Sequence, residues 1–321
     1  MIDKQKFLVS IIIPCYNAER WIAEAIDSAL SQTYLPIEVI VIDDGSIDNS
    51  LSIIKSYGHH IRWVTDTNKG QCVAKNKGFQ LSKGKYIQWL DADDYLLPDK
   101  IKNQVSHLEA TQADIVYGDW RHQYEEIQPA KLGEIKISGE QEDILESLLS
   151  GWWASPAAYL VRRDIVEQIN GWNENLRAQD DPDFWIRAAI IEAKFVYQPG
   201  CHSIYRRYGN VTVSTQNHQR WCDSYAQILE NSRASLKAKK NLQDKYKKAL
   251  AKLHFALARN YFDRDRKLYK YHLNLAQELN PDFQPSESGL YNLYAKLLGF
   301  TLADYLASWK RKVMTVATFN P

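Results

Sequence analysis

The sequence has few cysteines, little net charge and no long hydrophobic run, and each absence excludes a class of protein. Four cysteines occur among 321 residues. None lies in a C-x-x-C pair, which argues against a zinc site or a disulfide framework and indicates reduced, mostly buried thiols. Lys and Arg total 40 against 39 Asp and Glu, a net charge of +1, so nothing favours a nucleic-acid binder.

The amino-terminal apolar run is too short to direct or anchor the chain. It covers Val9–Ile13 and stops at Pro14, which does not fit a signal peptide. No stretch approaches the roughly 20 apolar residues of a membrane-spanning helix. We therefore expect a cytoplasmic protein that is soluble or attached peripherally to the inner face of the cell membrane.

The remaining composition is that of a globular chain with an uneven charge distribution. Apolar residues make up 45% and aromatic residues 12% of the sequence, which allows a proper core and excludes a disordered tail. Residues 233–272 hold 13 Lys and Arg but only three acids, whereas residues 1–232 hold 23 basic and 32 acidic residues. This asymmetry predicts two parts with different surfaces.

The first 120 residues alternate between strand-type and helix-type patterns. Such alternation predicts a parallel sheet with helices on both faces, which binds ligands at the carboxyl ends of its strands. Strands are expected at Val9–Ile13, Glu38–Ile42, Ile61–Val64, Tyr86–Leu90 and Ile115–Tyr117, and helices at Ala18–Gln32, around Ile53–Ile54, at Gly70–Leu81 and from Pro98 to about Ala110.

The rest of the chain is less regular. Residues 121–140 are expected to be irregular, and the chain from about Trp221 onward is expected to be helical, with breaks near Pro281 and Pro285. Between these parts we expect helices at Glu142–Ser150, Arg163–Ile169 and Asp180–Glu192, a strand at Ala157–Val161, and extended segments at Lys194–Tyr197 and His202–Arg207.

Acidic side chains follow two of the expected parallel strands. Asp91 and Asp93 are spaced to turn toward one site, and carboxylates suit Mg²⁺ or Mn²⁺. The alternative is an acidic turn before the next helix. Asp44, after the second strand, can accept hydrogen bonds from a base or a ribose, or belong to a plain strand–turn–helix junction.

Together these segments resemble a known family. The resemblance covers roughly residues 7–215 and is carried by Val9-Ser10-Ile11-Ile12-Ile13-Pro14-Cys15-Tyr16-Asn17, Asp43-Asp44-Gly45-Ser46, Asn68-Lys69-Gly70, Ala74-Lys75-Asn76-Lys77-Gly78 and Asp91-Ala92-Asp93-Asp94. In this order and spacing they are similar to family 2 glycosyltransferases. The resemblance implies an α/β GT-A fold, Rossmann-like with a mostly parallel sheet, over residues 1–218, and an α-helical carboxyl-terminal domain over residues 219–321.

The resemblance also implies a reaction and its participants. It implies metal-dependent, inverting and non-processive transfer of a sugar from a nucleotide-diphosphate sugar, with a UDP-sugar favoured, to a saccharide or lipid-linked acceptor in polysaccharide, lipopolysaccharide or glycolipid assembly. Mn²⁺ or Mg²⁺ would be held by Asp93 and Asp91. The donor would be bound by Pro14, Tyr16, Asn17, Asp44, Lys75, Asp91 and Asp93. Lys75 stands where such enzymes commonly have Arg, and a solvated helix lysine is the alternative.

The second half of the catalytic domain is expected to supply the general base. The segment of the family that carries the general base resembles Ala178-Gln179-Asp180-Asp181-Pro182-Asp183-Phe184-Trp185 of this chain. The resemblance implies that Asp181 is the general base and that Asp180 lies on the acceptor side. An acceptor hydroxyl is a poor nucleophile, so a carboxylate must accept its proton. The alternative is that these acids merely favour a helix N-terminus.

Other residues have two interpretations each. Trp152 and Trp153 stack on the acceptor or a sugar, or pack in the core. Many relatives carry His near Tyr208, where His202 or one of Arg206 and Arg207 would have to compensate. The basic helices, with Trp309-Lys310-Arg311-Lys312, contact a membrane surface peripherally or present a solvated face.

The sequence leaves two alternative interpretations of the function of the whole protein. A sugar-phosphate nucleotidylyltransferase would need a Gly-rich, basic loop after the first strand, and Pro14-Cys15-Tyr16-Asn17 does not supply it. The second is a binding module: a catalytically degenerate transferase fold whose helical tail recruits a partner.

Overall fold

The chain folds into two compact units, and each is described by itself. The computed structural model describes residues 7–127, 129–176, 178–208, 218–285 and 289–317. The first unit comprises residues 1–148 and 152–224, and the second comprises residues 149–151 and 225–321. The boundary after residue 224 falls inside a helix, α9 (His218–Ala238).

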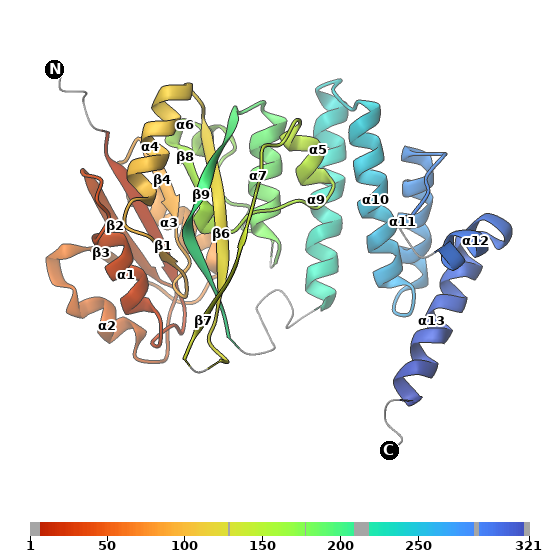
Figure 1. Ribbon diagram of the computed structural model, residues 1–321, viewed down its shortest axis with the longest axis horizontal. Coiled ribbons are helices and arrows are strands. Elements are labelled where there is room, and N and C mark those ends of the chain that lie inside the picture. Colours follow the sequence, from red (N-terminus) through yellow and green to blue (C-terminus); the bar gives the residue numbers. More distant parts are fainter. Residues whose placement is uncertain (1–6, 128, 177, 209–217, 286–288, 318–321) are drawn as a thin grey trace. The chain divides into compact units, whose positions relative to one another are not determined.

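One sheet forms the centre of the first unit (Figure 1). Among the described residues it has nine strands in the order β3-β2-β1-β4-β8-β6-β9-β5, with β7 paired to β6 off that path. The first four are parallel, as are β6 and β9, whereas β8, β5 and β7 run antiparallel to their neighbours. The strands are β1 (Val9–Cys15), β2 (Ile37–Asp43), β3 (Arg62–Thr65), β4 (Tyr86–Trp89), β5 (Tyr95–Leu96), β6 (Ile115–Tyr124), β7 (Lys131–Lys136), β8 (Tyr159–Arg162) and β9 (Phe195–Arg207).

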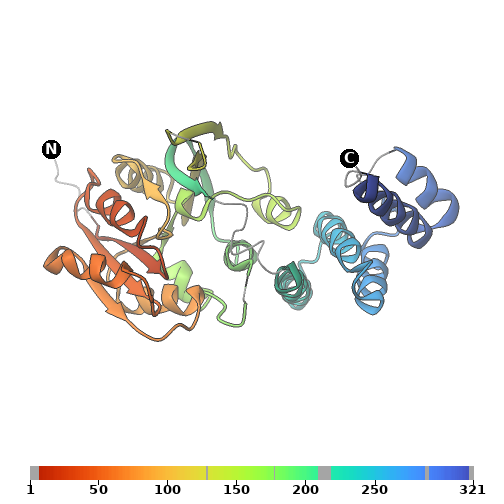
Figure 2. The same ribbon diagram turned by 90° about the horizontal axis from the view of Figure 1, so that it is seen from below.

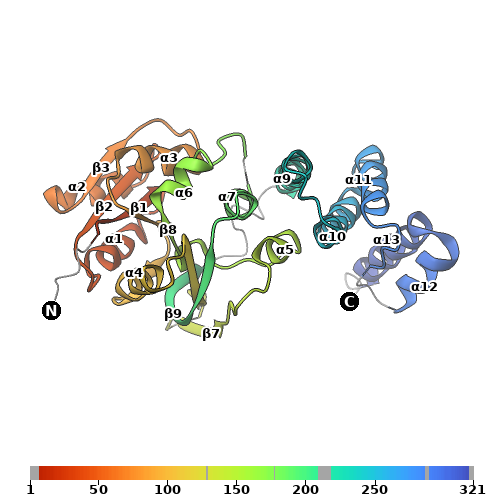
Figure 3. The same ribbon diagram turned by 90° about the horizontal axis from the view of Figure 1, so that it is seen from above.

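Helices cover both faces of the sheet (Figure 3). Ile11 and Ile13 of β1 point into the core under α1 and α4, while Ile40 and Ile42 of β2 pack with Ala74 of α3 on the other face. Strands buried on both faces explain why these segments read as continuous apolar runs. The helices are α1 (Ile22–Leu30), α2 (Ser50–Ser56), α3 (Gln71–Leu81), α4 (Lys100–Thr111), α5 (Ile144–Leu149), α6 (Arg163–Gln168) and α7 (Asp180–Ile190), with short 3-10 turns at Gly58–His60 and Pro156–Ala158.

One expectation about the middle of the chain was wrong, and another was confirmed but incomplete. Residues 121–140 are not irregular, because β6 continues to Tyr124 and returns through β7. The two extended segments expected around residues 194–207 form the single strand β9, which pairs with β6 from Ile115 to Tyr124. The pairing of β6 with β9 shifts its register on both sides of Asp119, as happens at a β-bulge.

The second unit is helical, as expected. It holds the rest of α9 and four further helices: α10 (Asp244–Tyr261), α11 (Arg266–Leu279), α12 (Gly289–Leu298) and α13 (Phe300–Ala317). The carboxylate of Asp265 caps α11 by accepting from the backbone N–H groups of Lys267 and Leu268. None of the described helices is both long and apolar enough to span a bilayer.

Candidate functional site

The loops that follow β1 and β2 are joined by hydrogen bonds. The backbone N–H of Asn17 donates to Ser46 Oγ at 3.0 Å, and Asn17 Oδ1 accepts from the N–H of Ile47 at 2.9 Å. Asn17 has a left-handed φ of 50°. Pro14 is buried within β1, whereas the ring of Tyr16 is 49% exposed. Tyr16 therefore offers an exposed ring, and Asn17, which is also exposed, joins the two loops that present this ring.

Asp44 fixes the start of α3. Its Oδ1 accepts from the N–H of Lys69 at 2.8 Å and its Oδ2 from the N–H of Gly70 at 2.9 Å. The carboxylate is buried, and the strand–turn–helix interpretation of this motif is thus present in the structure. Each oxygen keeps a second lone pair, so these bonds still allow Asp44 to accept from a ligand.

Lys75 of α3 joins the second half of the unit to the first. Its Nζ is fully buried and lies 2.9 Å from Asp180 Oδ2 and 3.4 Å from Asp181 Oδ1 at the start of α7. It also sits 3.8 Å from the ring centre of Trp172. One turn earlier, Gln71 Nε2 donates to both oxygens of Asp180 at 2.7 Å. Lys75 is therefore not a solvated helix lysine.

This pairing separates the two neighbouring aspartates. Burial raises the pKa of Asp180, but Lys75 and Gln71 outweigh burial and hold that pKa below its ordinary value. Burial, together with Asp180 and Asp91, outweighs Lys75 at Asp181 and raises its pKa to about 7. Asp181 is 29% exposed and Asp180 only 7%. Asp180 is the fixed counterion, and Asp181 is the accessible carboxylate suited to exchange a proton.

The acids after β4 belong to the same cluster. Burial, with the charges of Asp93 and Asp180, outweighs Lys75 and raises the pKa of Asp91 to about 6. Asp93 Oδ2 accepts from the hydroxyl of Tyr208 at 2.8 Å. The charge of Asp91 in turn acts on Asp181 and Lys75. The end of β4 and the start of α7 are thus close enough to influence each other electrostatically.

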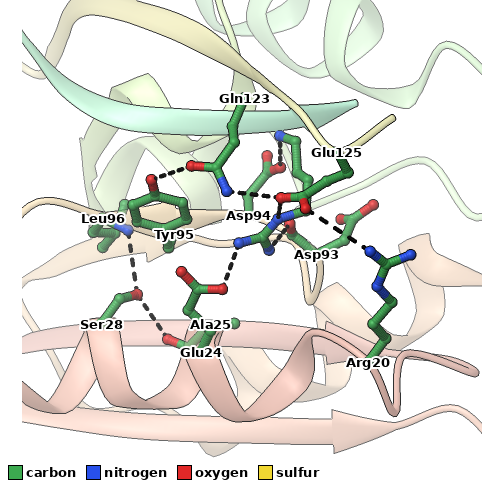
Figure 4. A network of polar contacts seen from close by, with 11 residues as sticks. Arg20, Glu24, Ala25, Ser28, Asp93, Asp94, Tyr95, Leu96, Gln123 and Glu125 are labelled. Atoms are coloured by element: carbon green, nitrogen blue, oxygen red, sulfur yellow. Dashed lines mark hydrogen bonds and ion pairs between the residues drawn. The ribbon is translucent and has the colours of Figure 1, made fainter. Parts of the chain in front are cut away.

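A buried arginine, Arg206, anchors the acidic turn after β4. Figure 4 labels four of its partners, Glu24, Asp93, Asp94 and Glu125. The guanidinium of Arg206 donates to the carbonyl of Asp93 at 2.6 Å, to Glu125 Oε1 at 2.9 Å and to Glu24 Oε2 at 2.5 Å. Its backbone N–H donates to Asp94 Oδ1 at 2.8 Å. These contacts engage the guanidinium of Arg206 from several sides, so Arg206 holds the acidic turn in place rather than facing a ligand.

The donor set fits a hard divalent cation. Burial and, after it, the charge of Asp93 raise the pKa of Asp91, and a bound cation would offset both effects. Within the described part of the chain, no group of three or more His, Cys, Asp or Glu side chains is placed to hold a metal. A cation here would therefore share its coordination with phosphate oxygens and water, as Mg²⁺ commonly does.

The two tryptophans differ. Trp152 is half-buried and packs edge-on against Tyr117. Trp153 is 48% exposed and stacks on Trp120 with ring centres 4.9 Å apart. It also lies near Tyr205. Burial raises the pKa of Tyr205, and the acids after β4 raise it further. This favours packing for Trp152 and leaves Trp153 with a free ring face. His202 lies against Asn103 of α4 at 3.4 Å, whereas Tyr208 contacts Asp93.

Sequence reasoning missed several partners of these residues. Gln71 carries a signal, since it lies four residues before Lys75 on the same helix face. Glu24 and Glu125 carry none, because they are far from Arg206 in sequence and only the sheet brings them together. Trp120 falls at the register shift of β6.

Comparison with known proteins identifies the family. The sequence model of glycosyl transferase family 2 matches residues 10–169. An uncharacterized glycosyltransferase of Haemophilus influenzae is 31% identical over 65% of this chain and 82% of its own length. The chain belongs to family 2 of the glycosyltransferases. Another relative, the uncharacterized glycosyltransferase RP339 of Rickettsia prowazekii, is 35% identical over 56% of this chain and 58% of its own length.

Two solved structures share the fold of this family 2 chain. TarS 1–349 of S. aureus, in complex with UDP-GlcNAc, has a TM-score of 0.68 at 16% identity and covers 96% of this chain and 92% of its own. The mannosyltransferase PcManGT from Pyrobaculum calidifontis, in complex with GDP-Man and Mn²⁺, has a TM-score of 0.54 at 19% identity over 99% and 82% of the two chains. The expected GT-A fold with a helical carboxyl-terminal region is confirmed. The chain spans about a third to three fifths of the length of its rickettsial relatives.

Proposed function

We propose that this chain transfers a sugar from a nucleotide-diphosphate sugar to an acceptor hydroxyl, with inversion at the anomeric carbon and with the help of a divalent cation. The observation that carries the proposal is the cluster in which Asp91 and Asp93 share one electrostatic environment with Asp181. A base and a phosphate-binding centre on neighbouring elements are what this reaction needs.

On the donor side, Tyr16 presents an exposed ring for the base, and Asp44 keeps acceptor capacity for a base N–H or a ribose hydroxyl. Pro14 and Asn17 shape the loop beneath them. Asp91 and Asp93 would hold Mn²⁺ or Mg²⁺, which would neutralise charge developing on the leaving diphosphate. TarS with UDP-GlcNAc and PcManGT with GDP-Man and Mn²⁺ support a donor of this class, with the uridine nucleotide favoured.

On the acceptor side, Asp181 acts as the general base. Its carboxylate takes the proton of the acceptor hydroxyl as the oxygen–carbon bond to the sugar forms. The bond from the anomeric carbon to the diphosphate breaks, and the diphosphate leaves with the electron pair. Lys75 orients Asp181 and fixes the charge of Asp180. Attack opposite the leaving group gives inversion.

The acceptor is a saccharide or a lipid-linked saccharide, in the assembly of a polysaccharide or glycolipid. Trp153 supports this part of the proposal, because an aromatic face packs well against sugar C–H groups and its ring is 48% exposed. Peripheral contact of the helical unit with the inner face of a membrane belongs to the same proposal.

Donor hydrolysis tests the function. The protein is incubated with UDP-, GDP- and dTDP-sugars and Mn²⁺, and release of the nucleoside diphosphate is followed by chromatography. We expect slow cleavage of at least one donor, abolished in Asp93→Ala and retained in Asp99→Ala, which removes an exposed acid outside the cluster. Donor binding without turnover across donors and acceptors would instead indicate the degenerate binding module.

A further inference from the structure

Large exposed apolar side chains are concentrated in one short part of the second unit. Nine of the 21 large hydrophobic residues exposed among the described residues lie between positions 290 and 309. Single exposed hydrophobic residues are ordinary, but a cluster of this size marks an interaction surface. The nine are Leu290, Leu293, Tyr294, Leu297, Leu298, Leu302, Tyr305, Leu306 and Trp309.

Eight of them form two helical stripes with the same spacing. On α12 the stripe is Leu290, Leu293, Tyr294 and Leu297, and on α13 it is Leu302, Tyr305, Leu306 and Trp309. Both follow the i, i+3, i+4, i+7 pattern of one helix face. The two helices pack against each other in the dark blue part of the chain (Figure 2).

Tyr305 packs edge-on against the buried ring of Phe262, but the faces of α12 and α13 that are buried in the core of the unit carry other residues. Tyr291 of α12 and Ala303 and Asp304 of α13 are buried. The Asp304 carboxylate accepts from the hydroxyls of Tyr269 and Tyr291 and pairs with Arg259 at 3.0 Å. The helices are therefore fixed to the unit by one face and leave a second apolar face exposed.

Charge identifies what would cover that face. Asp304 is the only acid between residues 289 and 310, and it is buried, whereas Lys296 and Lys310 are exposed. The whole segment 225–321 holds 17 Lys and Arg against eight Asp and Glu. A second copy would bring like charges together. An anionic surface with an apolar interior satisfies both the leucines and the lysines.

We propose that the exposed stripes of α12 and α13 dock the chain onto the surface of an anionic lipid bilayer. Leu side chains enter the acyl boundary, while Trp309 and the tyrosines lie at the headgroup level, where aromatic rings are favoured. Lys296 and Lys310 meet the anionic headgroups. Docking is interfacial, since none of the described helices is suited to span the membrane. This inference assigns the peripheral membrane contact of the proposed function to one face of the second unit, and the docking itself does not require glycosyl transfer.

This placement differs from docking through the lysines of α9, of the turn after it and of α10. Four of these lysines are exposed, namely Lys237, Lys239, Lys248 and Lys252, but the cluster of exposed large hydrophobic residues lies on α12 and α13 instead. Those lysines alone would give purely electrostatic binding that disappears at high salt. Docking through the stripes predicts binding that salt weakens but does not remove.

Vesicle co-sedimentation of the full chain tests the proposal, with phosphatidylcholine vesicles that contain no or roughly 30% phosphatidylglycerol. We expect binding to the anionic vesicles, and at least about tenfold weaker partitioning for Leu297→Glu and for Leu306→Glu. The matched control is Leu35→Glu, since Leu35 is 62% exposed on the first unit and Leu297 is 67% exposed; it should bind like the wild type. Circular dichroism checks that each variant is folded.

Three results would overturn the proposal. If the wild-type protein does not co-sediment with the anionic vesicles, it has no such docking face. Equal binding by wild type, Leu297→Glu and Leu306→Glu would move the contact to the lysine-rich helices. A lipid-free oligomer that Leu297→Glu converts to a monomer would assign the face to a second copy. Donor hydrolysis needs no vesicles, so its failure is read separately.

Discussion

Asp181 makes fewer side-chain contacts in the described structure than its two acidic neighbours on α7, Asp180 and Asp183. Asp180 is bound by Lys75 and Gln71, and Asp183 pairs with Arg187 at 2.7 Å. Among the residues that the structure describes, the one side-chain contact of Asp181 is with Lys75 Nζ at 3.4 Å, and Asp181 is partly exposed. We predict that Asp181→Asn retains the donor affinity but lowers kcat for transfer by about 10²–10⁴-fold, the usual contribution of a general base.

The matched control for Asp181→Asn is Asp164→Asn. Asp164 is exposed in the first turn of α6 and so shares the helix N-terminal position without the cluster. It should leave kcat unchanged. Steady-state kinetics with the donor and acceptor found in the screen decide the matter, and near wild-type transfer by Asp181→Asn would refute the base assignment.

The raised pKa of Asp181 predicts a pH dependence. The base works only when it is ionised, and burial and its acidic neighbours raise its pKa to about 7. Below that pH the ionised fraction falls about tenfold per unit, so kcat/KM should rise with pH and level off above about 7. A profile already flat from about pH 5 upward would contradict this environment for the base.

Lys75 gives a stability prediction at the same scale. Lys75→Ala removes the cation facing Asp180 while both groups are buried, so it should lower the free energy of unfolding by about 3–5 kcal/mol. Lys77→Ala, on the same helix, breaks only the partly exposed pair with Asp66 and should cost less than about 1 kcal/mol. Denaturant unfolding compares the two, and equal losses would show that the buried pair adds nothing.

Much at this scale was accessible from the sequence. Asp91, Asp93 and Asp181 stand at motif positions, and the structure brings them into one cluster with Lys75. The sequence did not reveal that the side chains of Asp44 and Asn17 accept hydrogen bonds from backbone N–H groups, because these partners depend on the loop conformation. Nor did it separate Trp152, which is half-buried, from its neighbour Trp153, which is exposed.

At the scale of elements, Arg206 connects four parts of the first unit. Its contacts reach α1 through Glu24, the acidic turn after β4, and Glu125 just beyond β6, and its guanidinium lies near the ring of Tyr95 on β5. Arg206→Lys keeps the charge but cannot make three diverging hydrogen bonds. We predict a loss of about 3 kcal/mol in the free energy of unfolding.

Arg207→Lys is the control for Arg206→Lys. Arg207 is the next residue and is exposed, so its substitution should change the free energy of unfolding by less than about 0.5 kcal/mol. Chemical denaturation of both variants tests the difference. If the two substitutions cost the same, the network does not anchor the acidic turn.

Elements were predictable where local pattern and tertiary role agree. The strands before residue 120 are continuous apolar runs because both of their faces are buried. The segment 121–140 was not recognised as strand because the end of β6 and all of β7 are only partly buried or exposed, so no continuous apolar run marks them. Strand β9 was divided because a register shift interrupts its pairing with β6.

At the scale of the whole molecule, the charge asymmetry of the sequence corresponds to two units with different surfaces. The helical character of the second unit was predictable from its composition. The exposed stripes of α12 and α13 were not, because the spacing that marks an amphipathic helix does not tell which apolar face packs inward.

The central claim is that the acids after β4 and the carboxylate of Asp181 serve one reaction. Anomalous X-ray diffraction from crystals grown with Mn²⁺ and a nucleoside diphosphate tests it most directly. The account predicts one Mn²⁺ peak about 2.0–2.2 Å from oxygens of Asp91 or Asp93 and of the diphosphate, with Asp181 facing the same site. A manganese ion and nucleotide bound away from these acids would contradict the account.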